Sequence, residues 1–419
     1  MKVLWVLNSP IGTAAQVLGY SHAASGTWIA AAETKLKRLI PDLRIDYVVM
    51  GYSDRSVTND DLGCTVYEIS VKQCRGMRAP TRDKCQWKQA IKSASPDLIH
   101  IWGTEFTNML DVMDVSGDIP VAVTIQGVIT SLAKYCKSDV PYKELMKGHS
   151  IIALPAYLRA KAKEREMIKQ VSFEKEMLRR ADAILLDNGW SEAYCGISSS
   201  KAKILDFPLA INPVFETVEW SHDECIKNSI FTIAPSSSMK GAHILLKALA
   251  IVKESYPNVK LRIPGSVEGG RLSKIKEPPY FRYLRRLIKD LNLENNVELC
   301  GKLTSEQMAD ELRMANVFVM PSKAENQSAT LREAMWVGCP SVVSLVGAVH
   351  ELVIHGENAM CYRYEEYEVM AHEIMKLLSN PVEAQRIAEN GHKTIKEKYP
   401  MEQPLIHCAE WYQQATRRK

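Results

Sequence analysis

The chain has 419 residues, 46% of them hydrophobic and 24% charged, which is the profile of a soluble globular protein. This length predicts two large domains, because domains usually hold roughly 100–200 residues. With 53 basic and 49 acidic residues the formal charge is +4, which excludes a strongly basic nucleic-acid binder.

Short apolar runs rich in β-forming residues alternate along the chain with longer patterns of helical period. Strands are predicted at 2–8, 43–51, 97–102, 120–126 and 182–187 in the first half, and at 229–234, 259–264, 297–300, 316–320 and 341–345 in the second. Helices are predicted at 26–40, 158–180, 241–255, 279–291, 304–314, 329–338, 367–379 and 383–397. This alternation predicts an α/β protein with parallel sheets that are covered by helices on both faces.

The alternating pattern starts again near Ser229, after a segment (208–228) that carries prolines and several charges. We therefore expect an N-terminal domain over residues 1–210 and a C-terminal domain over residues 211–399. The last segment, 400–419, contains an aromatic helix that we expect to return to the first domain.

The sequence offers no targeting signal, so a cytoplasmic protein is expected. The N-terminal apolar stretch runs only from Val3 to Leu7, which is too short for a signal peptide and fits a first buried strand. No apolar run approaches the ~18–20 residues of a membrane span. The ten cysteines are scattered and form no C-x-x-C pair, which is typical of reduced cysteines in a cytosolic enzyme.

The most informative stretch begins where the predicted strand 316–320 runs into a loop. The following helix is predicted to start near Ser328 or Ala329, with Ser328 as its N-cap. A loop that joins the carboxyl end of a parallel strand to a helix N-terminus is where such sheets bind phosphates. Free amides at 327–330 are therefore expected to hold a diphosphate.

Two carboxylates flank this helix start, with seven residues between them. Glu325 lies in the loop and Glu333 lies within the helix. Because two carboxylates would repel an anionic ligand, binding to sugar or ribose hydroxyl groups is the consistent interpretation. The alternative is that both are solvated surface charges.

A second candidate phosphate contact lies upstream, where a strand, a loop and a helix follow one another. Lys240 stands at the helix start, where its ammonium and the helix dipole both favour a phosphate. Because many helices begin with Lys-Gly, an ordinary helix start is the alternative.

Polar and aromatic residues gather at two predicted strand ends in the first half. The strand 97–102 ends in a run that contains His100 and Glu105, and the strand 120–126 ends at Gln126. Such strand ends face the ligand in parallel sheets, so these residues are expected to line a ligand site. A core histidine is the alternative for His100.

Residues 321–360 resemble the signature of the retaining glycosyltransferases of family four, the glycosyl transferases group 1. The family pattern is a Pro-Ser strand end, a Glu, seven residues, Glu-Ala-Met, Gly-x-Pro and a Gly-Gly-x-x-Glu-Leu-Val turn. It is matched here by Pro321, Ser322, Glu325, Glu333, Ala334, Met335, Gly338, Pro340, Gly347, Glu351, Leu352 and Val353. Only the second turn glycine differs, since Ala348 stands there.

The resemblance implies a GT-B fold, with two Rossmann-like domains facing each other across a deep cleft. It implies that Glu325 contacts the donor sugar and Glu333 the nucleotide ribose. Lys240 and Gly241 match a Lys-Gly pair that binds the donor diphosphate. The Arg that usually precedes this pair is missing, because Ala234 and Pro235 stand in its place.

Further parts of the resemblance lie in the first half. Gly26, Thr27 and Trp28 are similar to the Gly-Gly-Trp that opens the first helix in related enzymes, where Gly26 would let the backbone approach the donor phosphates. A plain turn is the alternative. Gln126 stands where many relatives have a His near the transferred sugar, and because Gln cannot act as an acid or base it would only position the substrate.

Together these arguments define the candidate site. The catalytic and acceptor-side residues are Glu325, His100, Glu105 and Gln126. The donor-binding residues are Gly26, Thr27, Lys240, Gly241, Asn326, Gln327, Ser328, Ala329, Glu333 and Gly347. No D-x-D motif occurs, so neither a metal nor another cofactor is expected.

The expected function is transfer of a sugar, with retention, from a nucleotide-diphosphate sugar to a saccharide or lipid-linked glycan in surface polysaccharide biosynthesis. The alternatives are a sugar-nucleotide epimerase of the same form and a non-catalytic protein that binds nucleotide sugars. A basic helical pattern at 156–180 could give peripheral contact with anionic lipid at the inner membrane surface, although a solvated helix face is the simpler interpretation. No nucleic-acid partner is expected.

Overall fold

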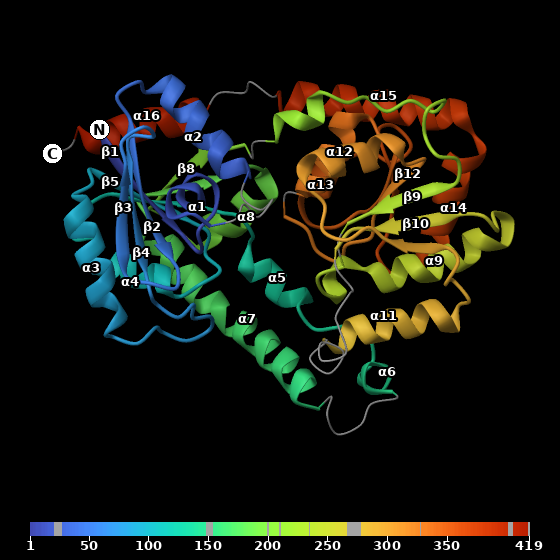
Figure 1. The fold of residues 1–419 in the computed structure, drawn as a ribbon, viewed down its shortest axis with the longest axis horizontal. Coiled ribbons are helices and arrows are strands. Elements are labelled where there is room, and N and C mark those ends of the chain that lie inside the picture. Colours follow the sequence, from blue (N-terminus) through green and yellow to red (C-terminus); the bar gives the residue numbers. More distant parts are fainter. Residues whose placement is uncertain are drawn as a thin grey trace. The chain divides into compact units, whose positions relative to one another are not determined.

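The computed structural model describes residues 1–20, 27–147, 154–198, 201–208, 211–233, 235–265, 278–326, 328–400 and 405–417. The chain folds into two compact units (Figure 1). The first unit comprises Met1–Lys134, Arg165–Ala210 and Glu402–Lys419, and the second comprises Tyr135–Glu164 and Ile211–Met401.

The first unit contains an eight-stranded sheet with the order β3-β4-β2-β1-β5-β6-β7-β8. Its strands are β1 (Lys2–Leu7), β2 (Arg44–Met50), β3 (Arg55–Asn59), β4 (Cys64–Ile69), β5 (Leu98–Trp102), β6 (Val121–Thr124), β7 (Ala183–Leu186) and β8 (Lys203–Asp206). All neighbours pair in parallel except β3 and β4. Successive residues of β1 enter the hydrophobic clusters on opposite faces of this sheet, so both faces are buried.

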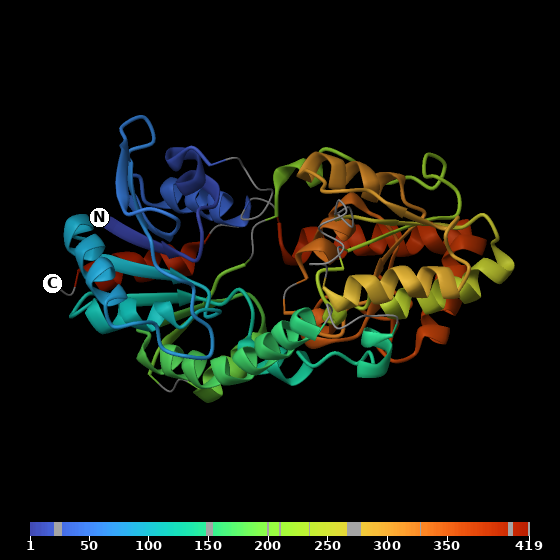
Figure 2. The same cartoon turned by 60° about the horizontal axis from the view of Figure 1, so that its bottom comes forward.

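The helices that belong wholly to the first unit are α1 (Gly12–Leu18), α2 (Thr27–Leu39), α3 (Asp83–Ala94), α4 (Asn108–Val115), α8 (Gly189–Ser198) and α16 (Ile406–Thr416). Helix α5 (Ile129–Tyr135) ends at the boundary between the units. Helix α7 (Leu154–Arg180) is a single long helix (Figure 2), and its residues up to Glu164 belong to the second unit and those from Arg165 to the first. Helix α16 is fastened to the sheet by Tyr412, whose hydroxyl accepts a hydrogen bond from the Trp5 indole at 3.2 Å.

The second unit contains a six-stranded, wholly parallel sheet with the order β11-β10-β9-β12-β13-β14. Its strands are β9 (Ser229–Thr232), β10 (Lys260–Ile263), β11 (Val297–Leu299), β12 (Val317–Met320), β13 (Ser341–Ser344) and β14 (Met360–Tyr362). Its helices are α6 (Tyr142–Met146), α9 (Ala242–Ser255), α11 (Pro279–Asp290), α12 (Ser305–Met314), α13 (Ala329–Val337), α14 (Tyr367–Ser379) and α15 (Pro381–Lys398). Short 3-10 turns lie at η2 (Pro213–Glu216), η3 (Ser238–Lys240) and η4 (Gly347–Glu351).

Each sheet has a point at which the direction of strand addition reverses. In the second unit β10 lies on one side of β9 and β12 lies on the other, and in the first unit β2 and β5 flank β1 in the same way. Ligands of open parallel sheets bind outside the carboxyl ends of the strands at such a switch point. The topology therefore predicts ligand sites at the loops after β9 and β12 in the second unit, and at those after β1 and β5 in the first.

The two sheets, one mainly and one wholly parallel, and their covering helices confirm the predicted α/β class. Several elements were not predicted, among them the β3–β4 hairpin, β8, β14 and the short helices α1, α4, α5, α6 and α8. No helix in the described part of the chain is long and apolar enough to cross a membrane.

The assignment of all of residues 1–210 to one domain is wrong for Tyr135–Glu164, which belongs to the second unit. Val140 and Leu145 are buried in the hydrophobic core of that unit. The guanidinium of Arg286 donates hydrogen bonds to the backbone carbonyls of Glu144 and Lys147, the second at 2.8 Å. These contacts hold residues 135–164 against the second unit.

Candidate active site

The candidate donor site lies at the switch point of the second sheet. The chain leaves β9 and passes through the turn η3 to Lys240, and it leaves β12 through the loop 321–326 to Glu325. Helix α9 follows the first loop and helix α13 the second. Two helix N-termini and two charged side chains thus meet at one edge of the sheet, an arrangement suited to an anion with hydroxyl groups attached.

Lys240 and Glu325 form an ion pair in this site. The Lys240 Nζ lies 2.7 Å from Glu325 Oε1, and the Ser322 hydroxyl donates to the same oxygen at 2.5 Å. The Glu325 side chain is only 11% exposed. No described residue donates to its other oxygen, Oε2, so the carboxylate is fixed on one side and keeps an acceptor on the other.

Two glycines allow the backbone to close around Glu325. Gly241 has φ of 68°, and a Cβ atom there would lie 1.6 Å from the carbonyl oxygen of Pro321. Gly347 has φ of 56°, and a Cβ atom there would lie 1.7 Å from the carbonyl oxygen of Glu325. Any side chain at either position would displace the loop, because both the left-handed backbone and the space require glycine.

Strand β13 and the turn η3 also support the loop. The Ser344 hydroxyl donates to the Ser322 carbonyl at 2.5 Å, and the Lys323 amide donates to the Met239 carbonyl at 2.7 Å. Ser322 and Ser344 are both fully buried. Sequence reasoning matched Ser322 to the family pattern but assigned no function to Ser322 or Ser344, because a serine at a strand end carries no signal of its partner.

Glu333 lies in the second turn of α13 and is partly buried. Burial raises the pKa of its carboxyl group to about 7. Among the described residues none forms a hydrogen bond or ion pair with this carboxyl group. A partly buried carboxyl group without a protein partner is suited to accept hydrogen bonds from ligand hydroxyl groups.

The start of α13 differs in one respect from the prediction. Ser328 occupies the N-cap position with φ of 42°, but its hydroxyl caps no amide and instead donates to Met320 Sδ at 2.7 Å. The predicted side-chain cap is therefore wrong, because the left-handed backbone turns the hydroxyl toward β12. The amides of Ala329 and Thr330 have no acceptor among the described residues and stay available to a ligand. Asn326 is buried before this turn, whereas Gln327 lies outside the described residues.

The switch point of the first sheet brings Asn8 and Glu105 together. The Asn8 amide donates to Glu105 Oε2 at 3.3 Å and to the Trp102 carbonyl at 3.3 Å. Gly103 has φ of 92°, and a Cβ atom there would lie 2.0 Å from Glu105 Oε2, so glycine is needed for this approach. Burial raises the pKa of the Glu105 carboxyl group to about 7, a value suited to proton transfer near neutral pH.

His100 was predicted on the acceptor side, and the structure contradicts this. Its side chain is fully buried, hydrogen-bonded through Nδ1 to the Tyr412 hydroxyl and through Nε2 to Thr124 Oγ1 at 2.5 Å. Burial lowers its pKa to about 3, so the ring is neutral. His100 therefore joins α16 to the sheet. Sequence reasoning could not separate this role from a catalytic one, because Tyr412 lies 312 residues away.

Two residues that sequence reasoning missed organise the neighbouring loops of the first unit. Glu174 on α7 is buried and accepts hydrogen bonds from the amides of Ile129 and Thr130 at 2.8 and 2.7 Å, which caps the start of α5. Gln170, one turn earlier, donates to the Thr104 carbonyl at 2.8 Å and accepts from the Gly76 amide at 2.8 Å. Their sequence context is a charged helix, which resembles a solvent-facing surface.

The remaining predicted residues are less informative. Gln126 lies partly exposed just after β6, near the end of which the chain turns toward α5. Thr27 is the first residue of α2, and its side chain and the whole of Gly26 lie outside the described residues. The structure thus brings Lys240, Gly241, Glu325 and Gly347 together. The roles expected for Gln126, Thr27 and Gly26 stay predictions.

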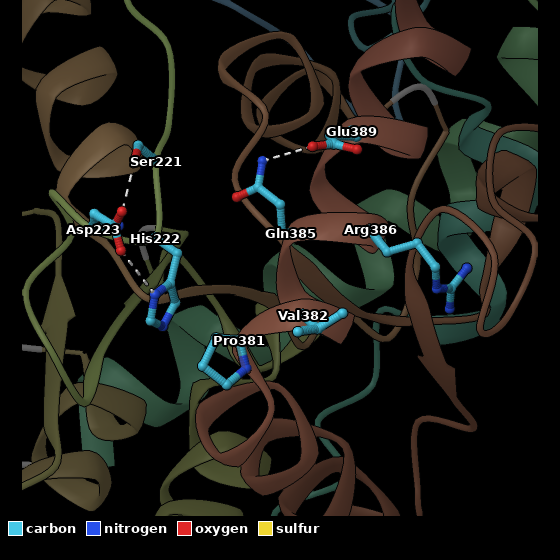
Figure 3. Close-up of a pocket in the computed structure, with 8 residues that line it drawn as sticks. All are labelled: Ser221, His222, Asp223, Pro381, Val382, Gln385, Arg386 and Glu389. Carbon is cyan, nitrogen blue, oxygen red and sulfur yellow. Dashed lines mark hydrogen bonds and ion pairs between the residues drawn. The ribbon is translucent and has the colours of Figure 1, made fainter.

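A separate groove of about 590 Å³ lies elsewhere in the second unit (Figure 3). It is lined by Ser221, His222, Asp223, Pro381, Val382, Gln385, Arg386 and Glu389. These residues come from the segment before β9 and from the first half of α15, not from the carboxyl ends of the strands. Within the groove Gln385 donates a hydrogen bond to Glu389 at 2.9 Å. Because none of the lining residues comes from the loops after β9 or β12, the groove is not part of the candidate donor site.

Comparison with known proteins agrees with the geometry. Residues 224–394 match the family model described as Glycosyl transferases group 1. Mannosylfructose-phosphate synthase from Agrobacterium fabrum is 27% identical over 131 residues, which are 31% of this chain and 28% of that protein. D-inositol 3-phosphate glycosyltransferase from Pseudarthrobacter chlorophenolicus is 32% identical over 122 residues, 29% of this chain and 27% of that protein. The matched segments therefore span less than a third of these curated relatives.

Two solved structures cover almost the whole chain. Sucrose-phosphate synthase from Thermosynechococcus elongatus superposes with a TM-score of 0.72 at 16% identity, over 100% of both chains. Anabaena HepE in complex with UDP-glucose superposes with a TM-score of 0.67 at 15% identity, over 99% of this chain and 100% of that one. The fold is that of the GT-B glycosyltransferases. The match to the glycosyl transferases group 1 covers residues 224–394, which lie in the second unit.

Proposed function

We propose that this protein is a retaining glycosyltransferase that moves a sugar from a nucleoside-diphosphate sugar to a saccharide or lipid-linked glycan. The observation that carries the proposal is the Lys240–Glu325 pair at the switch point of the second sheet, with Nζ and Oε1 2.7 Å apart. The ammonium is suited to the donor diphosphate and the second carboxylate oxygen to the sugar hydroxyls. The family of residues 224–394 and the UDP-glucose complex of the Anabaena neighbour support the same donor class.

The donor is proposed to bind through backbone as much as through side chains. The free amides at the start of α13 and the N-terminus of α9 favour a diphosphate. Gly241 and Gly347 let the surrounding backbone close tightly. Glu333, whose carboxyl group has no described partner, is assigned to the ribose hydroxyls. The site as proposed uses no divalent metal and no other cofactor, because these groups and Lys240 supply the positive field, and the sequence has no D-x-D pair.

The proposed reaction takes place on one face of the donor sugar. The bond between the anomeric carbon and the leaving phosphate oxygen breaks, and the acceptor oxygen bonds to the same face. The acceptor proton passes to the leaving phosphate. Glu325 holds the sugar hydroxyls and contributes through positioning rather than as a covalent nucleophile. On the acceptor side, Glu105 is assigned to hold the acceptor hydroxyl through a hydrogen bond, because it lies just beyond the carboxyl end of β5, and Gln126 is assigned to substrate orientation.

We place this reaction in surface polysaccharide assembly at the cytoplasmic side of the membrane. A lipid-linked acceptor would bring the enzyme to the inner membrane surface, and a peripheral contact with that surface is part of the proposal.

A screen of nucleotide sugars tests the proposed function. The protein is incubated with UDP-, GDP- and ADP-linked hexoses, in the presence of a chelator, and thermal shift and nucleoside diphosphate release are both measured. A ligand present at 100 times its Kd stabilises the folded state by about 2.7 kcal/mol, which gives a readable shift in Tm. Release of nucleoside diphosphate supports the proposal. Isomerised donor with no release would indicate an epimerase, and rate loss restored only by magnesium or manganese would remove the metal-independent form.

A further inference from the structure

One corner of the second unit leaves large apolar side chains in solvent. On α7, Leu154 is 41% and Leu158 56% exposed, and on α6 Tyr142 is 52% exposed. Leu154 and Leu158 are four residues apart and therefore share one face of the helix. The rings of Tyr142 and Tyr157 lie 4.4 Å apart, which places α6 beside the first turns of α7.

The start of α7 receives little packing from the rest of the protein. Between residues 154 and 164 no described side chain is buried, whereas Gln170, Met177 and Leu178 farther along the helix are. Leucines on a surface helix normally face the core. Here they do not, so their exposure is not explained by the folding of this chain alone.

The same segment carries an excess of positive charge. Residues 135–164 contain six lysines and arginines against three acidic residues. Each acidic residue is already engaged. Asp139 accepts from the Tyr364 hydroxyl at 2.7 Å, Glu144 lies 3.4 Å from Arg286, and Glu164 lies 2.7 Å from Lys161.

Five cations of this segment, Lys137, Lys143, Lys147, Arg159 and Lys163, are exposed, and none has an acidic partner among the described residues. Lys143 lies on α6, and Arg159 and Lys163 lie on α7. Lys143, Arg159 and Lys163, together with Tyr142, Leu154 and Leu158, form what we call the α6–α7 patch. It combines apolar groups able to enter an interface with cations able to contact its charged rim.

We propose that the α6–α7 patch docks this protein on a bilayer that carries anionic lipids. Exposed leucine and tyrosine next to lysine and arginine are the composition that sits at the boundary between acyl chains and negatively charged headgroups. A nucleic acid would use the cations but leave the leucines in water. The inference gives a location to the membrane contact of the proposed function. The inference rests on the proposed function for that contact, but its test is vesicle binding, which is measured without any sugar transfer.

The test is co-sedimentation of the full chain with vesicles of phosphatidylcholine alone and with vesicles that contain about one third phosphatidylglycerol. The wild type is expected to bind the anionic vesicles at least tenfold more tightly, and binding is expected to weaken as salt rises, because surface charges are screened. Arg159→Glu with Lys163→Glu should abolish the preference. Leu154→Gln with Leu158→Gln should lower binding to anionic vesicles roughly tenfold without changing its salt dependence.

A matched control carries the same charge change elsewhere in the second unit. Lys227 and Lys393 are both exposed, so Lys227→Glu with Lys393→Glu should bind like the wild type if the patch itself, and not overall charge, is responsible. All these residues are exposed, so Tm should stay within about 2 °C of the wild type. Equal binding of patch variants and wild type, or no binding of the wild type to anionic vesicles, would overturn the proposal. A leucine-dependent shift in oligomeric state without vesicle binding would also overturn it and assign the patch to self-association.

Discussion

The substitution Glu325→Gln tests the candidate donor site most closely. In the structure Oε1 of Glu325 accepts from Lys240 at 2.7 Å and from Ser322 at 2.5 Å, while Oε2 faces no described donor. Glutamine keeps the size and can still accept from Ser322. It loses the ion pair with Lys240 and the charge that strengthens bonds to sugar hydroxyls.

The magnitude follows from those losses. A hydrogen bond to a charged group contributes about 1.5–3 kcal/mol, so transfer is expected to slow by roughly 10- to 150-fold. The free nucleoside diphosphate should bind at least as tightly as before, because the Lys240 ammonium is no longer neutralised by a carboxylate.

The assay measures single-turnover transfer and nucleoside diphosphate affinity on the same preparations. Glu357→Gln, an exposed carboxylate in the same unit, serves as the matched control and should leave both unchanged. Near-normal turnover of Glu325→Gln would remove this residue from the site. A glycosyl adduct trapped on Glu325 in the wild type would refute the same-face mechanism.

Three further predictions concern Lys240, Glu333 and His100. Lys240→Ala should weaken binding of the free nucleoside diphosphate by roughly ten- to a hundredfold, whereas Lys323→Ala in the adjacent loop should not, and equal effects would refute the assignment. In the folded state the pKa of Glu333 is raised to about 7, so its carboxyl group holds a proton more tightly than in the unfolded chain, and the free energy of unfolding falls as pH rises from about 4.5 to 7. Glu333→Gln should therefore have a higher Tm than the wild type at pH 8 but not at pH 4. A difference in Tm that is the same at both pH values would contradict the raised pKa. His100→Ala should cost about 2–4 kcal/mol of unfolding free energy, and an acceptor-KM effect with unchanged Tm would restore its predicted site role.

The regular parts of the fold could be predicted because they depend on local pattern. Strands such as β1 and β12 are short, mostly apolar runs, and they appear within one or two residues of their predicted bounds. The β3–β4 hairpin was missed because β3 is a polar edge strand without alternation. Its antiparallel pairing also breaks the alternating pattern used to read the rest.

The excursion of Tyr135–Glu164 into the second unit could not be predicted from local pattern. It depends on long-range contacts. One is the carboxylate of Asp139, which lies 3.3 Å from His243 and 2.7 Å from the Tyr364 hydroxyl. Desolvation raises the pKa of the Asp139 carboxyl group, but the hydrogen bonds from His243 and Tyr364 outweigh it and lower the pKa to about 2. Nothing in the residues around Asp139 reveals that its partners lie more than a hundred positions away.

The candidate site divides in the same way. The proximity of Lys240 and Glu325 follows from the topology, because both stand just beyond the carboxyl ends of neighbouring strands. The contacts that hold Glu325 in place, from Ser322 and from the backbone around Gly347, needed the structure. The function assigned to each of these residues stays a prediction until it is measured.

The central claim is sugar transfer from a nucleotide sugar with retention, and slow transfer to water tests it without knowledge of the acceptor. Proton NMR follows the sugar released from the best donor of the screen, in the first minutes before the free sugar equilibrates between its anomers. The account predicts that nucleoside diphosphate is released without added metal, that the new sugar first appears as the anomer present in the donor, and that Glu325→Gln suppresses both. Release of the opposite anomer, or of no nucleoside diphosphate from any donor tested, would contradict it.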